Sequence, residues 1–158
     1  MIYNADEVFE MAEQMERNGA HFYERAAESV RDLPARTMLN DLARIERKHE
    51  QIFAALRDEL TRREPLAFDP DGEAARYLDA MTTGKVFDVS DPGGRIGPDA
   101  SLRDVLTVAL EIEKNSVIYY TGLQELVPPS LGRDKVFAII REEMRHIRLV
   151  SEELARVS

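Results

Sequence analysis

The sequence predicts an all-α protein, an antiparallel bundle of four helices built from two similar helical hairpins. Apolar residues recur with helical spacing in four long segments, which are joined by a short, a long and a short connection. The second half of the chain also repeats the first half at an offset of 97 positions. With 158 residues, 44% apolar and 32% charged, we expect residues 1–158 to form a single domain.

The internal repeat lies in residues 12–23 (AEQMERNGAHFY) and 109–120 (ALEIEKNSVIYY). It aligns Glu16 with Glu113. Each stretch is followed by a Glu-x-x-His motif at the same offset, Glu46 and His49 in the first half, Glu143 and His146 in the second. The positions shared by the two halves are therefore mostly residue types that bind metals.

The first hairpin is predicted from helices over residues 4–30 and 33–62. Asn4 and Glu7 form a capping box for the first helix, while Asp32 caps the second. At about 100° per residue, apolar side chains surround Glu16 on one face of the first helix: Phe9, Ala12, Ala20, Tyr23, Ala27 and Val30. The same geometry places four others beside Glu46: Leu39, Leu42, Phe53 and Leu60.

The second hairpin is predicted from helices over residues 101–126 and 132–157, with Ser101 and Asp104 capping the third helix. Apolar residues again surround its two glutamates. The connection, residues 63–100, is rich in glycine and proline; residues 72–81 could form a short helix and residues 90–99 are turn-forming. A connection this long can travel the length of the bundle, as an antiparallel arrangement of two hairpins requires.

Composition excludes several classes of function. The net charge of −9 disfavours nucleic-acid binding, and no apolar run approaches the roughly 18 residues of a membrane span. The N-terminus lacks a signal pattern, so we expect a cytoplasmic protein without a membrane partner. Because the chain has no cysteine, any metal must bind to oxygen and imidazole ligands.

Four glutamates on apolar helix faces indicate a metal centre, because buried carboxylates repel one another unless cations neutralise them. Glu16, Glu46, Glu113 and Glu143 together carry four negative charges, which two divalent ions would balance. His49 and His146 would add one nitrogen ligand to each ion. This donor set is typical of di-iron and di-manganese bundles, and zinc also suits it.

Other readings of these residues remain open. A single Glu-x-x-His usually faces solvent, and only the matched second copy favours a site. We expect His21 at the surface or an interface. We expect four neighbouring glutamates to be solvated, with the first a competing ligand if its helix is rotated: Glu13, Glu50, Glu111 and Glu142. Tyr23 and Tyr120 would either pack in the core or bond to ligand carboxylates.

At these motifs the sequence resembles the rubrerythrin-like branch of the ferritin-like superfamily, over residues 5–62 and 101–157. The resemblance implies that the six residues named above are metal ligands, and that Glu46 and Glu143 bridge both ions and take part in catalysis. The chain departs from classical rubrerythrins because it has no cysteine-rich electron-transfer domain and carries Ser116 where they have an additional ligand glutamate. We also do not expect a 24-subunit ferritin-type store, since no fifth helix follows residue 157.

The resemblance implies a di-iron oxidoreductase that reacts Fe(II) with peroxide or O₂ and takes electrons from an external donor. Two alternatives use the same ligands: a non-catalytic protein for iron binding, storage or delivery, and a structural bundle with a zinc-filled site. We expect a homodimer, paired through the first two helices.

Overall fold

The computed structural model describes residues 5–62, 69, 71–82 and 92–158. Over these ranges the chain forms five α-helices and two short 3₁₀ helices, and it contains no strand. The predicted capping residue Asn4 lies outside the described residues, as does much of the connection. Among the described helices, none is long and apolar enough to cross a membrane.

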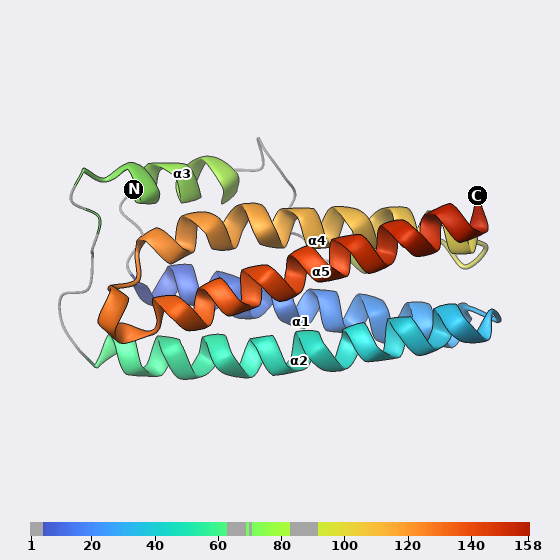
Figure 1. Ribbon diagram of the computed structural model, residues 1–158, viewed down its shortest axis with the longest axis horizontal. Helices are drawn as coiled ribbons and strands as arrows, with labels where there is room; N and C mark the ends of the chain where they lie inside the picture. The colour runs from blue at the N-terminus through green and yellow to red at the C-terminus, as the bar shows by residue number, and fades with distance from the viewer. Residues whose placement is uncertain (1–4, 63–68, 70, 83–91) are drawn as a thin grey trace.

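Four long helices run side by side and form the bundle (Figure 1). They are α1 (Ala5–Ser29), α2 (Leu33–Thr61), α4 (Leu102–Glu125) and α5 (Arg133–Val157). The α1–α2 hairpin packs against the α4–α5 hairpin, with α1 beside α4 and α2 beside α5. The predicted all-α, four-helix architecture is confirmed, and each helix begins and ends within about one residue of the predicted position.

Capping side chains determine where two of these helices begin. The Asp32 carboxylate accepts a hydrogen bond from the Ala35 backbone N–H at 2.9 Å, and Pro34 stands in the first turn of α2. At the start of α4, Ser101 and Asp104 exchange side-chain-to-backbone hydrogen bonds in a capping box. Both caps agree with the sequence prediction.

The connection between the hairpins contains α3 (Glu73–Thr82), which packs against the outside of α4 (Figure 1). The Tyr77 hydroxyl donates a hydrogen bond to the Ile118 carbonyl at 2.8 Å. Contact is close because Gly122 has no side chain: a Cβ there would lie 2.3 Å from the Tyr77 ring. The short helix predicted near residues 72–81 is therefore present, and it is anchored on α4.

Two 3₁₀ helices complete the described chain. Pro92–Arg95 lies in the predicted turn-forming segment and packs against α1 and α4, while Pro129–Leu131 separates α4 from α5. Gly132 follows with φ of 112°, a left-handed conformation that favours glycine. A Cβ at Gly132 would also lie 2.5 Å from the Leu56 side chain.

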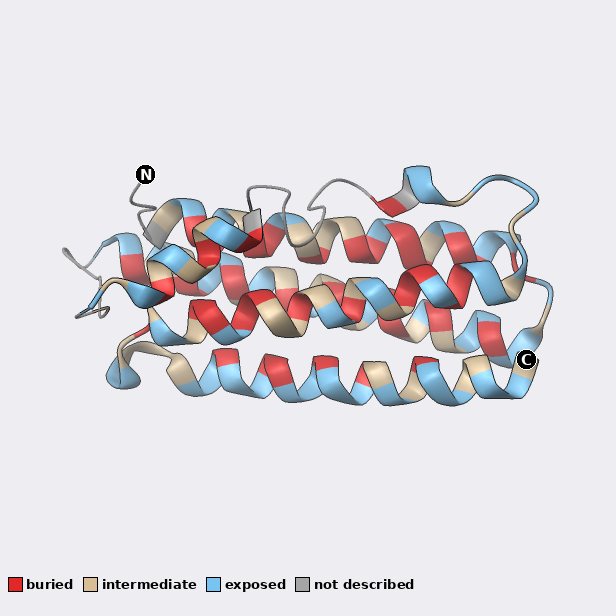
Figure 2. Ribbon diagram, turned by 90° about the horizontal axis from the view of Figure 1, so that it is seen from above, coloured by how far each residue is buried: buried red, intermediate tan, exposed pale blue. Residues whose placement is uncertain are grey.

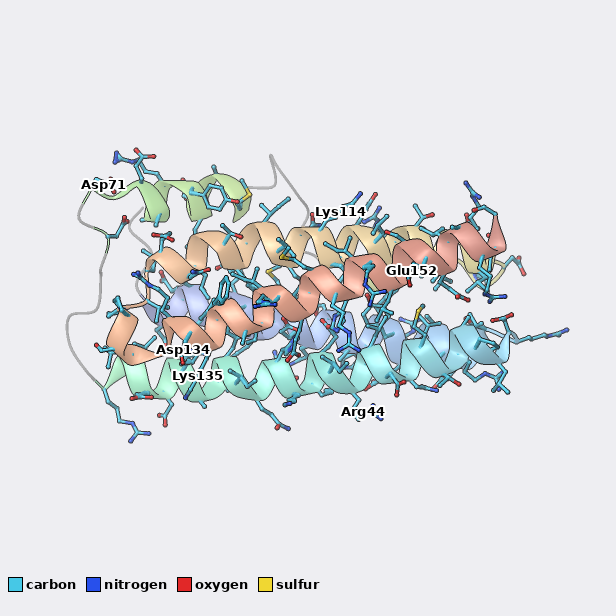
Figure 3. The ribbon with its side chains drawn as sticks, in the orientation of Figure 1. Arg44, Asp71, Lys114, Asp134, Lys135 and Glu152 are labelled. Carbon is cyan, nitrogen blue, oxygen red and sulfur yellow. The ribbon has the colours of Figure 1, made fainter. Side chains whose placement is uncertain are left out.

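The buried residues line the inner faces of the four long helices (Figure 2). They form two apolar clusters, one containing Phe53 and Tyr120, the other containing Tyr23 and Leu106. Each of the four long helices carries a buried glutamate between these two clusters. The outer faces carry charged side chains, among them Arg44, Lys114 and Glu152 (Figure 3). The bundle therefore encloses a polar layer in the middle of an apolar core.

Candidate metal centre

The structure brings together all six residues that the sequence analysis proposed as ligands. Each long helix contributes one glutamate, and α2 and α5 each add the histidine that lies three residues further on. All six are 0–2% exposed: Glu16, Glu46, His49, Glu113, Glu143 and His146. Carboxylates are costly to bury, and four of them close together also repel one another. The centre therefore needs a compensating positive charge.

The six side chains form two overlapping clusters. In each cluster, one donor atom from every member lies within 4.8 Å of the others. One cluster consists of Glu16, Glu46, His49 and Glu143; the other consists of Glu46, Glu113, Glu143 and His146. Because Glu46 and Glu143 belong to both clusters, each could supply an oxygen to two neighbouring ions.

Both imidazoles direct Nδ1 toward the carboxylates. His49 Nδ1 lies 2.7 Å from Glu143 Oε1 and 3.5 Å from Glu16 Oε2. His146 Nδ1 lies 3.3 Å from Glu113 Oε2 and 3.5 Å from Glu46 Oε1. The two rings stack 6.1 Å apart with an interplanar angle of 21°. The centre therefore has an approximate two-fold arrangement, as the repeat in the sequence predicts.

Many donor atoms in the centre lack a hydrogen-bond partner. Among the described residues, these include both oxygens of Glu46 and of Glu143, one oxygen each of Glu16 and Glu113, and Nδ1 of both histidines. The 2.7 Å approach of His49 Nδ1 to Glu143 Oε1 is short, but it lacks the direction of a hydrogen bond. Buried polar atoms are normally paired, and eight orphaned acceptors and imidazole nitrogens in one place need an explanation. Divalent cations supply one, because oxygen and imidazole donors fit iron, manganese or zinc.

The protonation of the metal-free centre reflects the crowding of its carboxylates. Burial, reinforced by neighbouring carboxylates, raises the pKa of Glu143 to about 8 and that of Glu46 well above its usual range. Burial alone would lower the pKa of His49, but Glu143 and Glu16 outweigh it and raise that pKa to about 11. For His146 the same opposition, with Glu113 and Glu143, gives a pKa of about 10. In the metal-free centre, bound protons thus offset the negative charge of the carboxylates, and metal ions would take the place of these protons.

Two tyrosines hold the carboxylates that belong to only one cluster. The Tyr23 hydroxyl donates a hydrogen bond to Glu113 Oε1, and the Tyr120 hydroxyl donates to Glu16 Oε1 at 2.5 Å. Both bonds cross between the hairpins, since Tyr23 lies on α1 and Tyr120 on α4. Both tyrosines are fully buried, so they pack in the core and also orient a carboxylate.

The contact of Glu142 with a ligand histidine is not predicted by the sequence. Glu142 was expected to be solvated, and its side chain is 47% exposed, yet its Oε2 receives a hydrogen bond from His49 Nε2 at 2.7 Å. The Glu142 carboxylate, on α5, contacts the ring nitrogen of His49 that faces away from the cluster. One signal was available: at about 100° per residue, Glu142 lies on the flank of α5 beside Glu143.

The prediction that Glu13 is solvated was wrong. Glu13 is 9% exposed, and its carboxylate lies 3.3 Å from the guanidinium of Arg57 on the neighbouring helix α2. It belongs to neither cluster. His21 is exposed and belongs to neither cluster, while Glu50 and Glu111 are engaged in ion pairs with arginines near the surface.

A glycine gives Glu46 its space. A Cβ at Gly19 would lie 2.9 Å from Glu46 Oε2, so a larger residue there would displace the carboxylate. The equivalent position in the second half is Ser116, which is also buried. This is the position where the rubrerythrin resemblance predicts an additional ligand, and a serine hydroxyl is too short and too weak an acceptor to replace a carboxylate.

Comparisons with known proteins support the fold. No protein-family model matches the chain, and no curated protein matches it. Among solved structures, the chain is similar to a protein from Thermotoga maritima that was proposed to be a ferritin-like diiron-carboxylate protein. The TM-score is 0.74, with 21% identity over 100% of this chain and 99% of that one. At this identity the likeness shows a ferritin-like helical fold, and the rubrerythrin-like branch stays a prediction.

Proposed function

We propose that this protein is a di-iron carboxylate oxidoreductase that reacts Fe(II) with peroxide or O₂. The observation that carries the proposal is the pair of overlapping clusters, in which a single buried layer holds six donor side chains with unpaired atoms. That the similar Thermotoga maritima protein is described as a diiron-carboxylate protein supports the choice of iron.

The residues divide into terminal and shared ligands. Glu16 and His49 would hold one ion, Glu113 and His146 the other, and Glu46 and Glu143 would serve both. Four carboxylates balance the charge of two divalent ions, so metal binding would release the protons that the histidines and Glu143 retain in the metal-free protein. Two ferrous ions, when bound, would supply the two electrons that reduction of peroxide requires.

The surrounding chain protects this chemistry. Apolar clusters on both sides of the polar layer limit the access of water, and the Tyr23 and Tyr120 hydroxyls fix the orientation of the terminal carboxylates. Because the chain has no cysteine, the electrons that restore Fe(II) would come from an external donor. We also propose a homodimer paired through α1 and α2, which sedimentation equilibrium would test.

Anaerobic loading with Fe(II), followed by stopped-flow mixing with H₂O₂ and with O₂ separately, tests the function. We expect about two ions per chain and an absorbance change characteristic of oxidised iron on mixing. An iron-loaded protein without any such change would refute redox function. Aerobic uptake far beyond two ions per chain would instead indicate storage, and a zinc-dependent melting temperature without redox chemistry would indicate a structural site.

A further inference from the structure

The two halves of the candidate metal centre differ behind their histidines. His49 is 1% exposed at its side chain, and its Nε2 is 2.7 Å from Glu142 Oε2. The repeat offset of 97 places Ile45 at the position equivalent to Glu142, since 142 − 97 = 45. Ile45 is half-buried and its alkyl side chain accepts no hydrogen bond. The position that would support His146 therefore lacks the carboxylate that supports His49.

This difference affects the nitrogen that would bind a metal. When Nε2–H of a histidine donates to a carboxylate, the tautomer and the ring orientation are fixed, and Nδ1 becomes a stronger donor. In this structure His49 Nδ1 already faces the cluster, 2.7 Å from Glu143 Oε1. Loss of such a supporting partner typically weakens metal binding by about 10–100-fold.

The other donors of the two positions are matched. Each has one terminal glutamate bonded to a tyrosine of the opposite hairpin, and both share Glu46 and Glu143. Glu142 thus distinguishes the two metal positions, because it contacts the ligand His49 and has no equivalent carboxylate behind His146.

We propose that Glu142 is a positioning residue that makes the two metal positions unequal, so that the position of Glu16 and His49 binds a divalent ion first and more tightly. This inference rests on the proposed metal binding. It adds an order in which the two ions bind, which the approximately symmetric ligands alone would not produce.

Zinc titration of the metal-free full-length protein, in competition with a chelator, measures the two affinities. We expect two steps separated by about tenfold or more. Glu142→Ala should weaken the tighter step by about 10–100-fold, and Glu142→Gln, which keeps an acceptor but loses the charge, should have an intermediate effect. Ile45→Glu should strengthen the weaker step. Glu152→Gln, on the exposed face of the same helix, is the matched control and should change neither step.

Histidine ¹⁵N NMR of the zinc-titrated protein assigns the steps. The first equivalent of zinc should shift the imidazole signals of His49, and the second those of His146. In Glu142→Ala the His49 Nε2–H signal should move while circular dichroism stays unchanged, an effect that simple loss of structure would not produce.

Equal affinities in the wild type, first filling at His146, or unchanged steps in Glu142→Ala would overturn the inference. Failure of the wild type to bind zinc or Fe(II) at all would refute the proposed function itself, so the two failures are distinguishable.

Discussion

The two hairpins present the same residues to the metal centre but differ on their outer sides. Between α1 and α2, charged side chains join the helices: Arg17 pairs with Glu50 at 2.9 Å, and Arg57 pairs with Asp6 at 2.6 Å and with Glu13 at 3.3 Å. At the equivalent positions of the second hairpin, 97 residues further on, three of these become apolar. Glu13 corresponds to Leu110, Glu50 to Ile147 and Arg57 to Leu154.

This difference shows which positions are constrained by metal binding and which only by the packing of two helices. The ligand positions must match because each ion needs a carboxylate and an imidazole from equivalent depths of the bundle. The outer positions need only hold two helices together, and either ion pairs or apolar packing does that. The halves also differ next to the ligands: Glu142 contacts His49 from an outer position, and Gly19 beside Glu46 corresponds to the buried Ser116.

The largest expected effect concerns the two shared carboxylates. Glu46→Ala and Glu143→Ala should each abolish most binding of both ions, because each removes a ligand from both clusters. Metal content after equilibrium dialysis measures this. Glu13→Ala removes a carboxylate that belongs to neither cluster and should retain two ions. Two ions bound with unchanged affinity in either shared-ligand variant would contradict the assignment.

Removal of metal should make the stability of the protein depend on alkaline pH. In the metal-free protein the pKa of His49 is about 11, that of His146 about 10 and that of Glu143 about 8. All three pKa values lie above those of the unfolded chain, so the folded state binds more protons, and stability falls as pH rises. The histidine contribution is complete below about pH 6.5 and is lost toward pH 10–11.

Thermal melts of metal-free and zinc-loaded protein measure this dependence. Between pH 7 and pH 10 the melting temperature of the metal-free protein should fall by more than about 5 °C. The loaded protein should lose much less, since its imidazoles carry metal rather than protons. Parallel curves for the two forms would show that the six residues are not linked to metal binding.

The Tyr23 and Tyr120 hydroxyls donate hydrogen bonds between the two hairpins, and their removal measures how much each bond stabilises the fold. Tyr23→Phe and Tyr120→Phe should each destabilise the metal-free protein by about 1.5–3 kcal/mol, because each leaves a buried carboxylate without its donor. Urea unfolding measures both. Tyr119→Phe is a matched control: its hydroxyl donates to the neutral Val8 carbonyl at 3.0 Å, and its loss should cost only about 0.5–1.5 kcal/mol. If both variants lose less unfolding free energy than Tyr119→Phe does, the two tyrosine–carboxylate bonds do not stabilise the fold.

The smallest expected effect concerns the outer side of the first hairpin. Arg57→Met should destabilise the protein by about 1 kcal/mol, because Asp6 and Glu13 both lose their cation, and the partial exposure of these side chains limits the cost. The double variant Arg57→Met with Glu13→Leu copies the apolar solution of the second hairpin and should recover most of the loss. If the double variant is less stable than the single one in urea unfolding, the two outer sides are not interchangeable.

The sequence by itself determined the helices and the face of each that carries a ligand. Helical periodicity fixes which residues share a face, so Glu16 and its three counterparts were placed among apolar neighbours without coordinates. Asp32 and Ser101 marked helix starts because capping is a local interaction. The matched offset then implied that the ligands lie at similar depths.

Only the tertiary structure decided which side chains meet across helices. That Tyr23 bonds to Glu113, that His49 bonds to Glu142 and that Glu13 is buried beside Arg57 all join residues more than 40 positions apart. Periodicity gives the direction of a side chain from its own helix axis. It does not give the rotation of one helix against its neighbour, and that rotation selects the partner that each polar atom finds.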